Sequence, residues 1–511
     1  MTFLSVLAVS IILALLGYRY IIYPAFLSPL SKIPNAHFTA SFCPLWMRWN
    51  RRGGREGIHS IYKAHQQKGS IVRLGPNEVS VASIDGLRKV YVGGFEKPRW
   101  YAEQFMHYQT PNLVSMVSPK EHAERRRALS HVYSKSYLLN SKDMQVIATA
   151  IIFERLLPIL EARAQGGAPV DLYQVNRAVG VDFMSAYVFG LRNSTNTICD
   201  ATLGQELFSK IDALLRNLSS GQKVRQEVEA LGLRHCQAAS LLLQQPSSPQ
   251  KDLSHLSTEP VVFASLQNHL PKSQKANLAI NPGVASETLD HFLAGSEGTK
   301  TTLTFLQWEL SKRLPLQARL HKELFTLNPP IKADFRMQGN ACGHRESPLL
   351  PSFQALDALP LLDAVVQESL RVYPASQAPQ PRVTPPGGCT IDQRFHVPGG
   401  VRISTAVFCM HRNEDVFPDS ASWKPERWME EQDPARLEEM RRWFWAFGSG
   451  PRTCIGRHFV VLVMKIMVAA IYTNYTTSIV DDERMEQADT FLGHPVGEKL
   501  MLKLSPVQKS L

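Results

Sequence analysis

The sequence predicts a mainly α-helical protein with a small β region, in which one large domain follows a short N-terminal anchor. Apolar side chains recur at helical spacing through most of the 511 residues. Strand-like runs are short, and they lie at 71–74, 78–82, 382–403 and 500–504. Length alone would suggest roughly three domains. The motifs described below are far apart but must meet at one site, so a single domain over 37–511 is favoured.

The composition bounds the classes of function. The chain is 44% hydrophobic and 20% charged, which is ordinary for a globular protein. Its net charge of +11 comes from scattered Lys and Arg without a nucleic-acid recognition motif. An anionic membrane surface or an acidic redox partner therefore suits the charge better than nucleic acid. The 7 cysteines are far apart and include no C-x-x-C pair, which argues against a disulfide scaffold and a structural zinc site.

The N-terminal segment is predicted to be a membrane anchor. Residues 3–17 are apolar and uncharged, and a helix that runs on to Tyr23 would rise about 31 Å, enough for a hydrocarbon core of ~30 Å. A cleaved signal peptide is the alternative, but Tyr18 and Arg19 stand where small residues would be needed. The flanking basic residues all follow the apolar run. We therefore expect 1–28 to be a single anchor in the endoplasmic reticulum membrane, with a cytosolic body.

Three segments are expected to be irregular. Two prolines predict a hinge over 29–36. Residues 244–283 are rich in Ser, Gln and Pro and lack sustained periodicity, so they are predicted to be a loop. Residues 328–360 carry several Pro and Gly. Because so long a structureless stretch is unusual in a compact domain, this segment is predicted to be a surface insertion.

The decisive segment is FGSGPRTCIG at 447–456. Its glycines would let backbone N–H groups approach a thiolate at Cys454, and the helix expected to follow would point its positive end at the sulfur. Six positions match the haem-binding loop of the cytochromes P450: Phe447, Gly448, Gly450, Arg452, Cys454 and Gly456. Six such matches by chance are expected in about one chain in 10⁵ or fewer. The chain thus resembles the cytochrome P450 family, the alternative being an inert cysteine in a glycine turn.

The resemblance implies the family's fold, with haem b between a long central helix and the cysteine loop. Cys454 would be the axial thiolate ligand of the iron, a ligand type that favours O–O cleavage. Phe447, Gly448 and Gly456 would surround the sulfur. The positions that contact haem propionates in the family are matched by His122, Arg126, Arg382 and Arg452. For the first two of these, a basic surface helix is the alternative.

A second motif lies on the expected helix 361–372. Glu368 and Arg371 are three residues apart and so share a face, an arrangement that by itself is usually a solvated surface pair. Here the helix is apolar and is followed by PERW, so the pair resembles the family's Glu–Arg–Arg triad, with Arg427 as third member. The implied role is structural. His411 is likewise expected to be a structural histidine.

The central helix is expected over 286–314, with Ser286 as its N-cap. The sequence AGSE matches the family's oxygen-binding pattern, which places Glu297 at the acid position. The next residue is normally the Thr that delivers protons, but here it is Gly298. Thr299 follows, turned by about 100° along the helix. These three are the expected catalytic positions, and their acid–alcohol pair is incomplete.

The resemblance implies a monooxygenase that inserts one oxygen atom of O₂ into a small apolar substrate. Electrons would come from NADPH through a membrane-bound flavoprotein reductase, with cytochrome b5 as a second candidate donor. The motifs are most similar to the membrane-bound fungal branch, which implies specialised (secondary) metabolism. Two alternatives stay open: a haem-thiolate isomerase or dehydratase that needs no reductase, and a non-catalytic haem-binding protein. By resemblance the substrate would contact 100–116, 244–283, 292–297, 375–380 and 489–494, with Gln377 and Gln380 as polar contacts.

Overall fold

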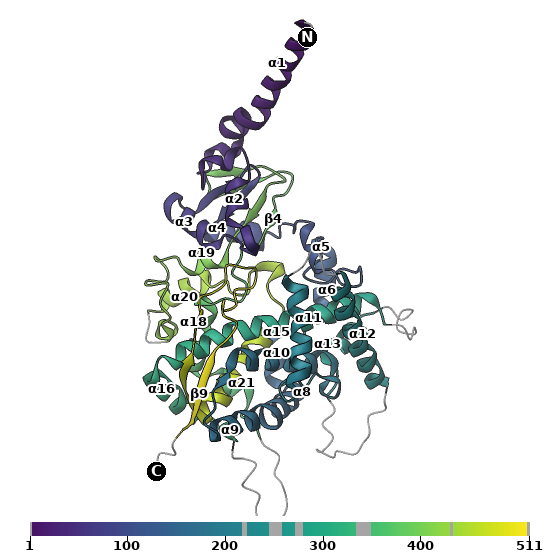
Figure 1. Cartoon of the computed structure of the whole chain (residues 1–511), viewed down its shortest axis with the longest axis vertical. Coiled ribbons are helices and arrows are strands. Elements are labelled where there is room, and N and C mark those ends of the chain that lie inside the picture. Colours follow the sequence, from purple (N-terminus) through teal and green to yellow (C-terminus); the bar gives the residue numbers. More distant parts are fainter. Residues whose placement is uncertain are drawn as a thin grey trace, which may run out of the picture.

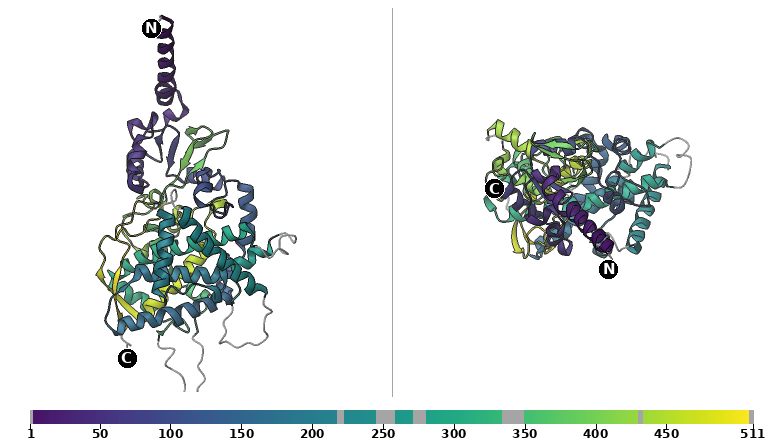
Figure 2. Two further views of the ribbon diagram at one scale, coloured as in Figure 1. Left: turned by 45° about the vertical axis from the view of Figure 1, so that its right-hand side comes forward. Right: turned by 90° about the horizontal axis from the view of Figure 1, so that it is seen from above.

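The computed structural model describes residues 3–216, 222–244, 258–270, 280–333, 349–429 and 433–507. Helices account for 60% of the residues and strands for 9%, so the mainly α fold class with a small β region is confirmed. Most helices form one large body. A smaller sheet region lies at the end of the body from which the N-terminal helix projects (Figures 1 and 2).

The helical body is arranged around α15 (Pro282–Ser311), which packs against α10 (Leu172–Phe189) and α21 (Arg457–Asn474). A Cβ on Gly180 would lie 3.0 Å from the carbonyl oxygen of Ser296, so the close approach of α10 and α15 depends on that glycine. Helix α21 is apolar enough to cross a membrane, but 78% of its apolar window is buried inside the body. It is therefore a core helix.

The other helices lie around this centre or beside the smaller sheet region (Figure 1). Before α10 they are α2 (Leu45–Asn50), α3 (Ile58–Lys68), α4 (Ile84–Leu87), η5 (Arg88–Val92), α5 (Trp100–Phe105), α6 (Pro119–Ser130), α7 (Lys135–Asn140), α8 (Lys142–Thr149), η6 (Ala150–Leu156) and α9 (Leu157–Gln165). After it come α11 (Ala201–Arg216), α12 (Gln222–Gln244), α13 (Val261–Asn268), α16 (Leu314–Leu324), α17 (Phe353–Asp357), α18 (Pro360–Val372), α19 (Val407–His411), η9 (Pro425–Trp428), α20 (Pro434–Trp443) and η10 (Gly450–Arg452).

The β structure of the described residues forms small sheets. The largest has the order β1 (Ile71–Gly75), β2 (Glu78–Val81), β7 (Arg402–Ser404), β4 (Arg382–Val383), and only the β2–β7 pair is parallel. A second has the order β3 (Val170–Asp171), β9 (Met501–Pro506), β8 (Tyr475–Asp481), and a hairpin joins β5 (Cys389–Ile391) to β6 (Phe395–Val397). The predicted strand regions are all found. Strand β8 was not predicted, although its run TTSIV is rich in β-branched residues.

The apolar N-terminal segment is exposed. It comprises α1 (Phe3–Gly17) and the wider π-helical η1 (Tyr18–Leu27), and 5–27 is long and apolar enough to cross a membrane. In this π-helix, Ser28 N–H donates to the carbonyl of Tyr23, five residues earlier. An α-helix would have used the carbonyl of Pro24, so that carbonyl is left available. Arg73 of β1 donates to this carbonyl at 2.7 Å and is only 1% exposed. The base of the apolar helix is therefore bonded to the first sheet.

The segment predicted as a hinge, 29–36, is packed against the body. Residues 29–32 form the 3₁₀ turn η2, and Leu30 and Ile33 are buried with side chains of the first sheet region. The long helix ends at Leu27, and Pro29 begins the 3₁₀ turn that follows. The buried apolar residues make 29–36 part of the core instead of a free hinge.

The two predicted irregular segments are partly ordered. Helix α13 lies inside 244–283 and buries its apolar side chains, so the loop prediction is wrong there, while 245–257 and 271–279 lie outside the described residues. Within 328–360, Ile331 and Phe353 are fully buried, so the predicted insertion is too wide. Its middle, 334–348, lies outside the described residues.

The predicted start of the central helix is also wrong. Asn281 is the N-cap, because its side-chain oxygen accepts from the N–H groups of Gly283 and Val284. Pro282 occupies the first helical position, where its missing N–H has no cost. Ser286 lies inside the helix, and its hydroxyl donates to the carbonyl of Thr110.

Candidate functional site

The cysteine loop connects α20 to α21, and both of its ends are fixed by backbone bonds. Trp445 N–H donates to Nε2 of His411 at 2.8 Å, and Nδ1 of the same ring donates to the carbonyl of Arg371 at 2.8 Å. Because one ring nitrogen accepts and the other donates, the imidazole is neutral, and burial lowers its pKa to about 3. Cys454 N–H donates to the carbonyl of Phe447 at 2.9 Å and closes the loop.

Two glycines shape the turn before the cysteine. Gly448 and Gly450 have φ values of +68° and +69°, a region that favours glycine. A Cβ on Gly450 would also collide with the carbonyl of Tyr91 in η5. These positions explain two glycines of the matched motif through backbone conformation and close packing.

The thiol of Cys454 is enclosed by the protein yet keeps accessible surface. Burial raises its pKa, whereas backbone N–H donors of Gly456 and Arg457 and the charge of Arg126 oppose this shift. The donors lie at the N-terminus of α21, where the helix dipole also favours negative charge. This environment suits a sulfur that becomes a thiolate on binding a metal ion.

Basic side chains from separate segments gather near the thiol. His122 of α6, Arg382 of β4, Arg452 of η10 and Lys97 lie within electrostatic reach of one another. Burial, followed by the charge of Arg382, lowers the pKa of Arg452 to about 10. Burial, with Arg452 and Lys97 next in effect, lowers the pKa of His122 to about 3. The three cations of this group, Lys97, Arg382 and Arg452, require an anionic partner, and the two carboxylates of a haem match that need, with neutral His122 as a further donor.

The predicted propionate ligands are therefore brought together, with one difference. Arg126 donates to the carbonyl of Thr453 at 2.7 Å and adjoins the thiol. Lys97, which sequence reasoning missed, belongs to the cluster, and its ammonium donates to the carbonyl of Val114 at 2.6 Å. In the sequence FEKPRW, which also contains Arg99, nothing marked this lysine as a member of the cluster.

The central helix has a notch of small residues. Between 283 and 307 every residue of α15 is buried except Ala294 and Gly298, which lie one turn apart on one face. A Cβ on Gly298 would meet no atom within 4 Å. The hydroxyl of Thr299 donates back to the carbonyl of Gly295 at 2.8 Å and is buried. The alcohol expected at this place in the helix is thus absent, and Thr299 does not replace it.

Glu297 contacts a different set of residues from the notch. Its carboxylate lies 2.6 Å from Nζ of Lys300 and 3.5 Å from Nη2 of Arg177. Arg177 in turn pairs with Asp212 of α11 at 2.5 Å. The carboxylate of the predicted acid is therefore held by cations between α10 and α15 and does not lie at the notch formed by Ala294 and Gly298.

The three residues of the predicted triad meet in a buried network. Glu368 accepts from Arg371 at 2.7 and 2.8 Å and from Nε of Arg427 at 2.9 Å. The indole N–H of Trp428 also donates to the carboxylate at 2.8 Å. Burial opposes ionisation, but the two arginines outweigh it and lower the pKa of Glu368. Since the backbone of Arg371 holds His411, the network also supports the start of the cysteine loop.

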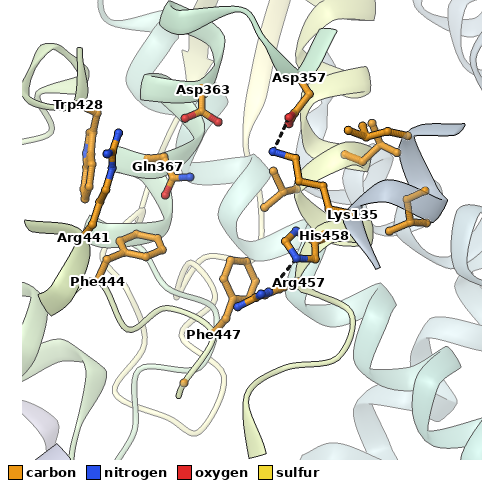
Figure 3. A pocket seen from close by; sticks show the side chains of 15 residues that line it. Lys135, Asp357, Asp363, Gln367, Trp428, Arg441, Phe444, Phe447, Arg457 and His458 are labelled. Atoms are coloured by element: carbon orange, nitrogen blue, oxygen red, sulfur yellow. Dashed lines mark hydrogen bonds and ion pairs between the residues drawn. The ribbon is translucent and has the colours of Figure 1, made fainter. Parts of the chain in front are cut away.

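A cavity of about 360 Å³ opens beside the cysteine loop, and it is lined by Phe447, Gly448 and residues of α7, α18, α20 and α21. Figure 3 shows basic side chains around it, with Lys135 paired to Asp357 at 2.6 Å and Arg457 beside His458. Arg441 contributes a further charge from α20. The lining therefore combines basic side chains with the carboxylates of Asp357 and Asp363.

Comparisons with known proteins agree with these features. The model of the family described as Cytochrome P450 matches residues 40–502. The chain is 30% identical over 420 residues to "Cytochrome P450 monooxygenase avaI" of Aspergillus versicolor, covering 78% of this chain and 94% of that protein. It is 25% identical to "Cytochrome P450 monooxygenase macH" of Penicillium terrestre, covering 98% and 99%. A crystal structure of a cytochrome P450 (CYP102L1) superposes with a TM-score of 0.71 at 16% identity, covering 93% of this chain and 99% of that one.

Proposed function

Since the chain belongs to the cytochrome P450 family and is a monooxygenase of that family, we propose that it oxygenates a small apolar intermediate of fungal specialised metabolism. The observations that carry this proposal are a donor-supported thiol at Cys454 and a small-residue notch on α15, the helix that packs against α21. The reaction would consume substrate RH, O₂, NADPH and a proton, and it would yield ROH, water and NADP⁺.

The chain's own residues would bind and orient the cofactor. Cys454 would ligate the iron, with N–H donors of Gly456 and Arg457 stabilising negative charge on sulfur. The propionates would pair with His122, Arg382 and Arg452, with Lys97 as an additional cation, and Arg126 would lie beside the thiolate. When bound, the haem supplies the oxygen chemistry, which a thiolate ligand favours.

Proton supply at the notch is proposed to use a group other than a protein alcohol. Gly298 offers open space where a threonine hydroxyl would otherwise stand. Water or a hydroxyl of the substrate can occupy that space and donate a proton. Glu297 can take part only if its carboxylate leaves the ion pair with Lys300.

The electron donor is proposed to dock beside the cysteine loop. Among the side chains that line the cavity, Lys135, Arg441 and Arg457 outnumber Asp357 and Asp363. This excess of positive charge fits an acidic, NADPH-dependent flavoprotein reductase, with cytochrome b5 as a second donor. The exposed helix 5–27 is proposed to anchor the chain in the endoplasmic reticulum membrane with the body in the cytosol.

The test is co-expression with a fungal reductase and candidate precursors, followed by mass spectrometry of the products. The proposal requires an oxygenated product whose formation depends on NADPH and reductase. Turnover without either would replace it with a haem-thiolate isomerase or dehydratase. Haem binding without substrate-dependent NADPH use would favour a non-catalytic haem protein.

A further inference from the structure

Asp290 lies on the same face of α15 as the notch. It is one turn before Ala294 and two turns before Gly298. At about 100° per residue, these positions differ from Asp290 by about 40° and 80° around the helix axis. The carboxylate therefore borders the part of the helix at which we propose that the substrate reacts.

Within the described residues, the carboxylate of Asp290 has no bonding partner. It is 7% exposed, and it has no hydrogen bond or ion pair within the part of the chain that the structure describes. The neighbouring carboxylate, Glu287, differs in this respect. It pairs with His291 at 3.2 Å and Arg125 at 3.4 Å and accepts from the N–H of Leu113. Because a buried carboxylate without a partner is costly, Asp290 is not explained by the packing of the body alone.

Four titratable side chains face Asp290. Glu287 and His291 are on its own helix, Lys97 precedes α5, and Tyr133 follows α6. Lys97 is within electrostatic reach, but its ammonium donates to the carbonyl of Val114 and stands over the ring of Tyr101, without an ion pair to Asp290. Burial and the charge of Glu287 raise the pKa of Asp290 to about 7, although the nearby His291 and Lys97 act to lower it. A cation brought next to this carboxylate would hold it ionised.

An aromatic group lies on the segment that follows Lys97. Trp100, Tyr101 and Phe105 of α5 contact one another, and Phe105 also contacts Phe491, with ring centroids 5.8 Å apart. Both segments belong to the regions expected to contact substrate. A ligand with an aromatic or apolar body and one positive group would match both features. Its apolar body would suit the aromatic cluster, and its positive group would suit the carboxylate of Asp290.

From this geometry we propose that Asp290 is a substrate-recognition residue that pairs with a positively charged nitrogen, an ammonium or guanidinium, on an otherwise apolar substrate. The inference rests on the proposed monooxygenase function, because it assigns a substrate class to that site. It concerns binding and orientation of the substrate and adds no chemical step.

The test compares two probes of equal shape on the purified holoenzyme at pH 8. One is (4-phenylbutyl)trimethylammonium, which is permanently charged and cannot ligate iron, and the other is its neutral isostere 5,5-dimethyl-1-phenylhexane. Dissociation constants come from equilibrium dialysis. The wild-type protein should favour the cation over the neutral probe about tenfold more than Asp290→Asn does. Asp290→Asn should leave the affinity for the neutral probe unchanged and keep the ferrous–CO spectrum.

Two further variants complete the design. Asp290→Glu keeps the charge and should keep a preference for the cation. Asp415→Asn removes an exposed carboxylate elsewhere and should leave the wild-type ratio unchanged. An affinity ratio of cation to neutral probe that is the same in the wild-type protein and in Asp290→Asn would overturn the assignment. Failure of the monooxygenase proposal would instead show as product formed without NADPH or reductase, whichever probe binds.

Discussion

Nζ of Lys300 lies 2.6 Å from Oε2 of Glu297, and both side chains are buried. The ammonium also stands over the ring of Tyr173 at 5.2 Å, on the neighbouring helix α10. Arg177, one helical turn further along α10, approaches the other carboxylate oxygen. The acid of the central helix is thus a counter-ion for two buried cations, and it must leave them before it can move a proton at the notch.

Glu297→Gln tests which of these two roles dominates. Removing the carboxylate leaves Lys300 buried without an ion-pair partner, whereas Arg177 keeps Asp212, so we expect the holoenzyme to lose about 3–5 kcal/mol of stability. The double variant Glu297→Gln/Lys300→Met removes one uncompensated cation and should regain much of that loss. The measurements are the thermal midpoint and the ratio of product to NADPH consumed, with peroxide assayed in parallel. If the carboxylate supplies protons, coupling stays poor in the double variant. Recovery of full coupling there would make Glu297 purely structural.

Cys454→Ser tests the ligand assignment. The variant should fold, because the serine keeps the backbone bond from position 454 to the carbonyl of Phe447. It should lose the strongly red-shifted Soret band of the ferrous–CO complex, since that band requires a thiolate. Cys409→Ser, in a buried cysteine outside the loop, is the matched control and should keep the band. An unchanged spectrum in Cys454→Ser would remove the cysteine from the site.

Gly298→Thr tests the open space at the notch. A Cβ meets nothing within 4 Å there, so the added methyl and hydroxyl should be accommodated. We expect better coupling of NADPH use to product for substrate analogues that lack a hydroxyl, and little change for the natural substrate. Thr299→Val is the control, because that hydroxyl is bonded to the carbonyl of Gly295 and should not affect coupling. Equal peroxide release from Gly298→Thr and wild type with every substrate would contradict the idea.

The orientation of the body across the membrane can be tested by glycosylation. The sequence has acceptor motifs at Asn193, Asn217 and Asn474, and a cytosolic body should leave all of them unmodified. Asn474 is a poor reporter, since its amide group is bonded to Ile331, Ala333 and Ala470. Asn217 lies outside the described residues. An acceptor motif appended after Leu511 gives an additional reporter, and its glycosylation would revive the signal-peptide interpretation.

Buried neutral histidines should make stability depend on pH. Burial lowers the pKa of His411 to about 3 and that of His65 to about 4, whereas in the unfolded chain histidine titrates near ~6.5. The unfolded state therefore takes up protons first as the pH falls below that value, and stability decreases from about pH 6.5 downwards. Each histidine contributes a slope of up to about 1.4 kcal/mol per pH unit. The thermal midpoint should be flat from pH 8 to 7 and fall by pH 5, less steeply in His411→Gln.

Local chemistry explains which parts of the site could be predicted from the sequence. The cysteine loop was predictable because its glycines are required by positive φ values and close backbone contacts within a short segment. The meeting of Glu368 with Arg371 needed only helical spacing. The partners of Glu297 were not predictable, because they depend on how α10 crosses α15. Lys97 and Asp290 were missed for the same reason, since each is a single charged residue whose role depends on distant neighbours.

The bond between Arg73 and the carbonyl of Pro24 makes the N-terminal helix a rigid connection to the body instead of a flexible one. Because the base of the helix is fixed to β1, the helix and the first sheet should tilt together. Phe38, Leu45 and Trp49 are 60–75% exposed on the segments just beyond this base. In a bilayer these side chains would reach the interfacial layer and set the depth of the body. The body would therefore keep one orientation relative to the bilayer, and a substrate dissolved in lipid would always approach the same face of the enzyme. Arg73→Met should let the body change its tilt relative to the N-terminal helix.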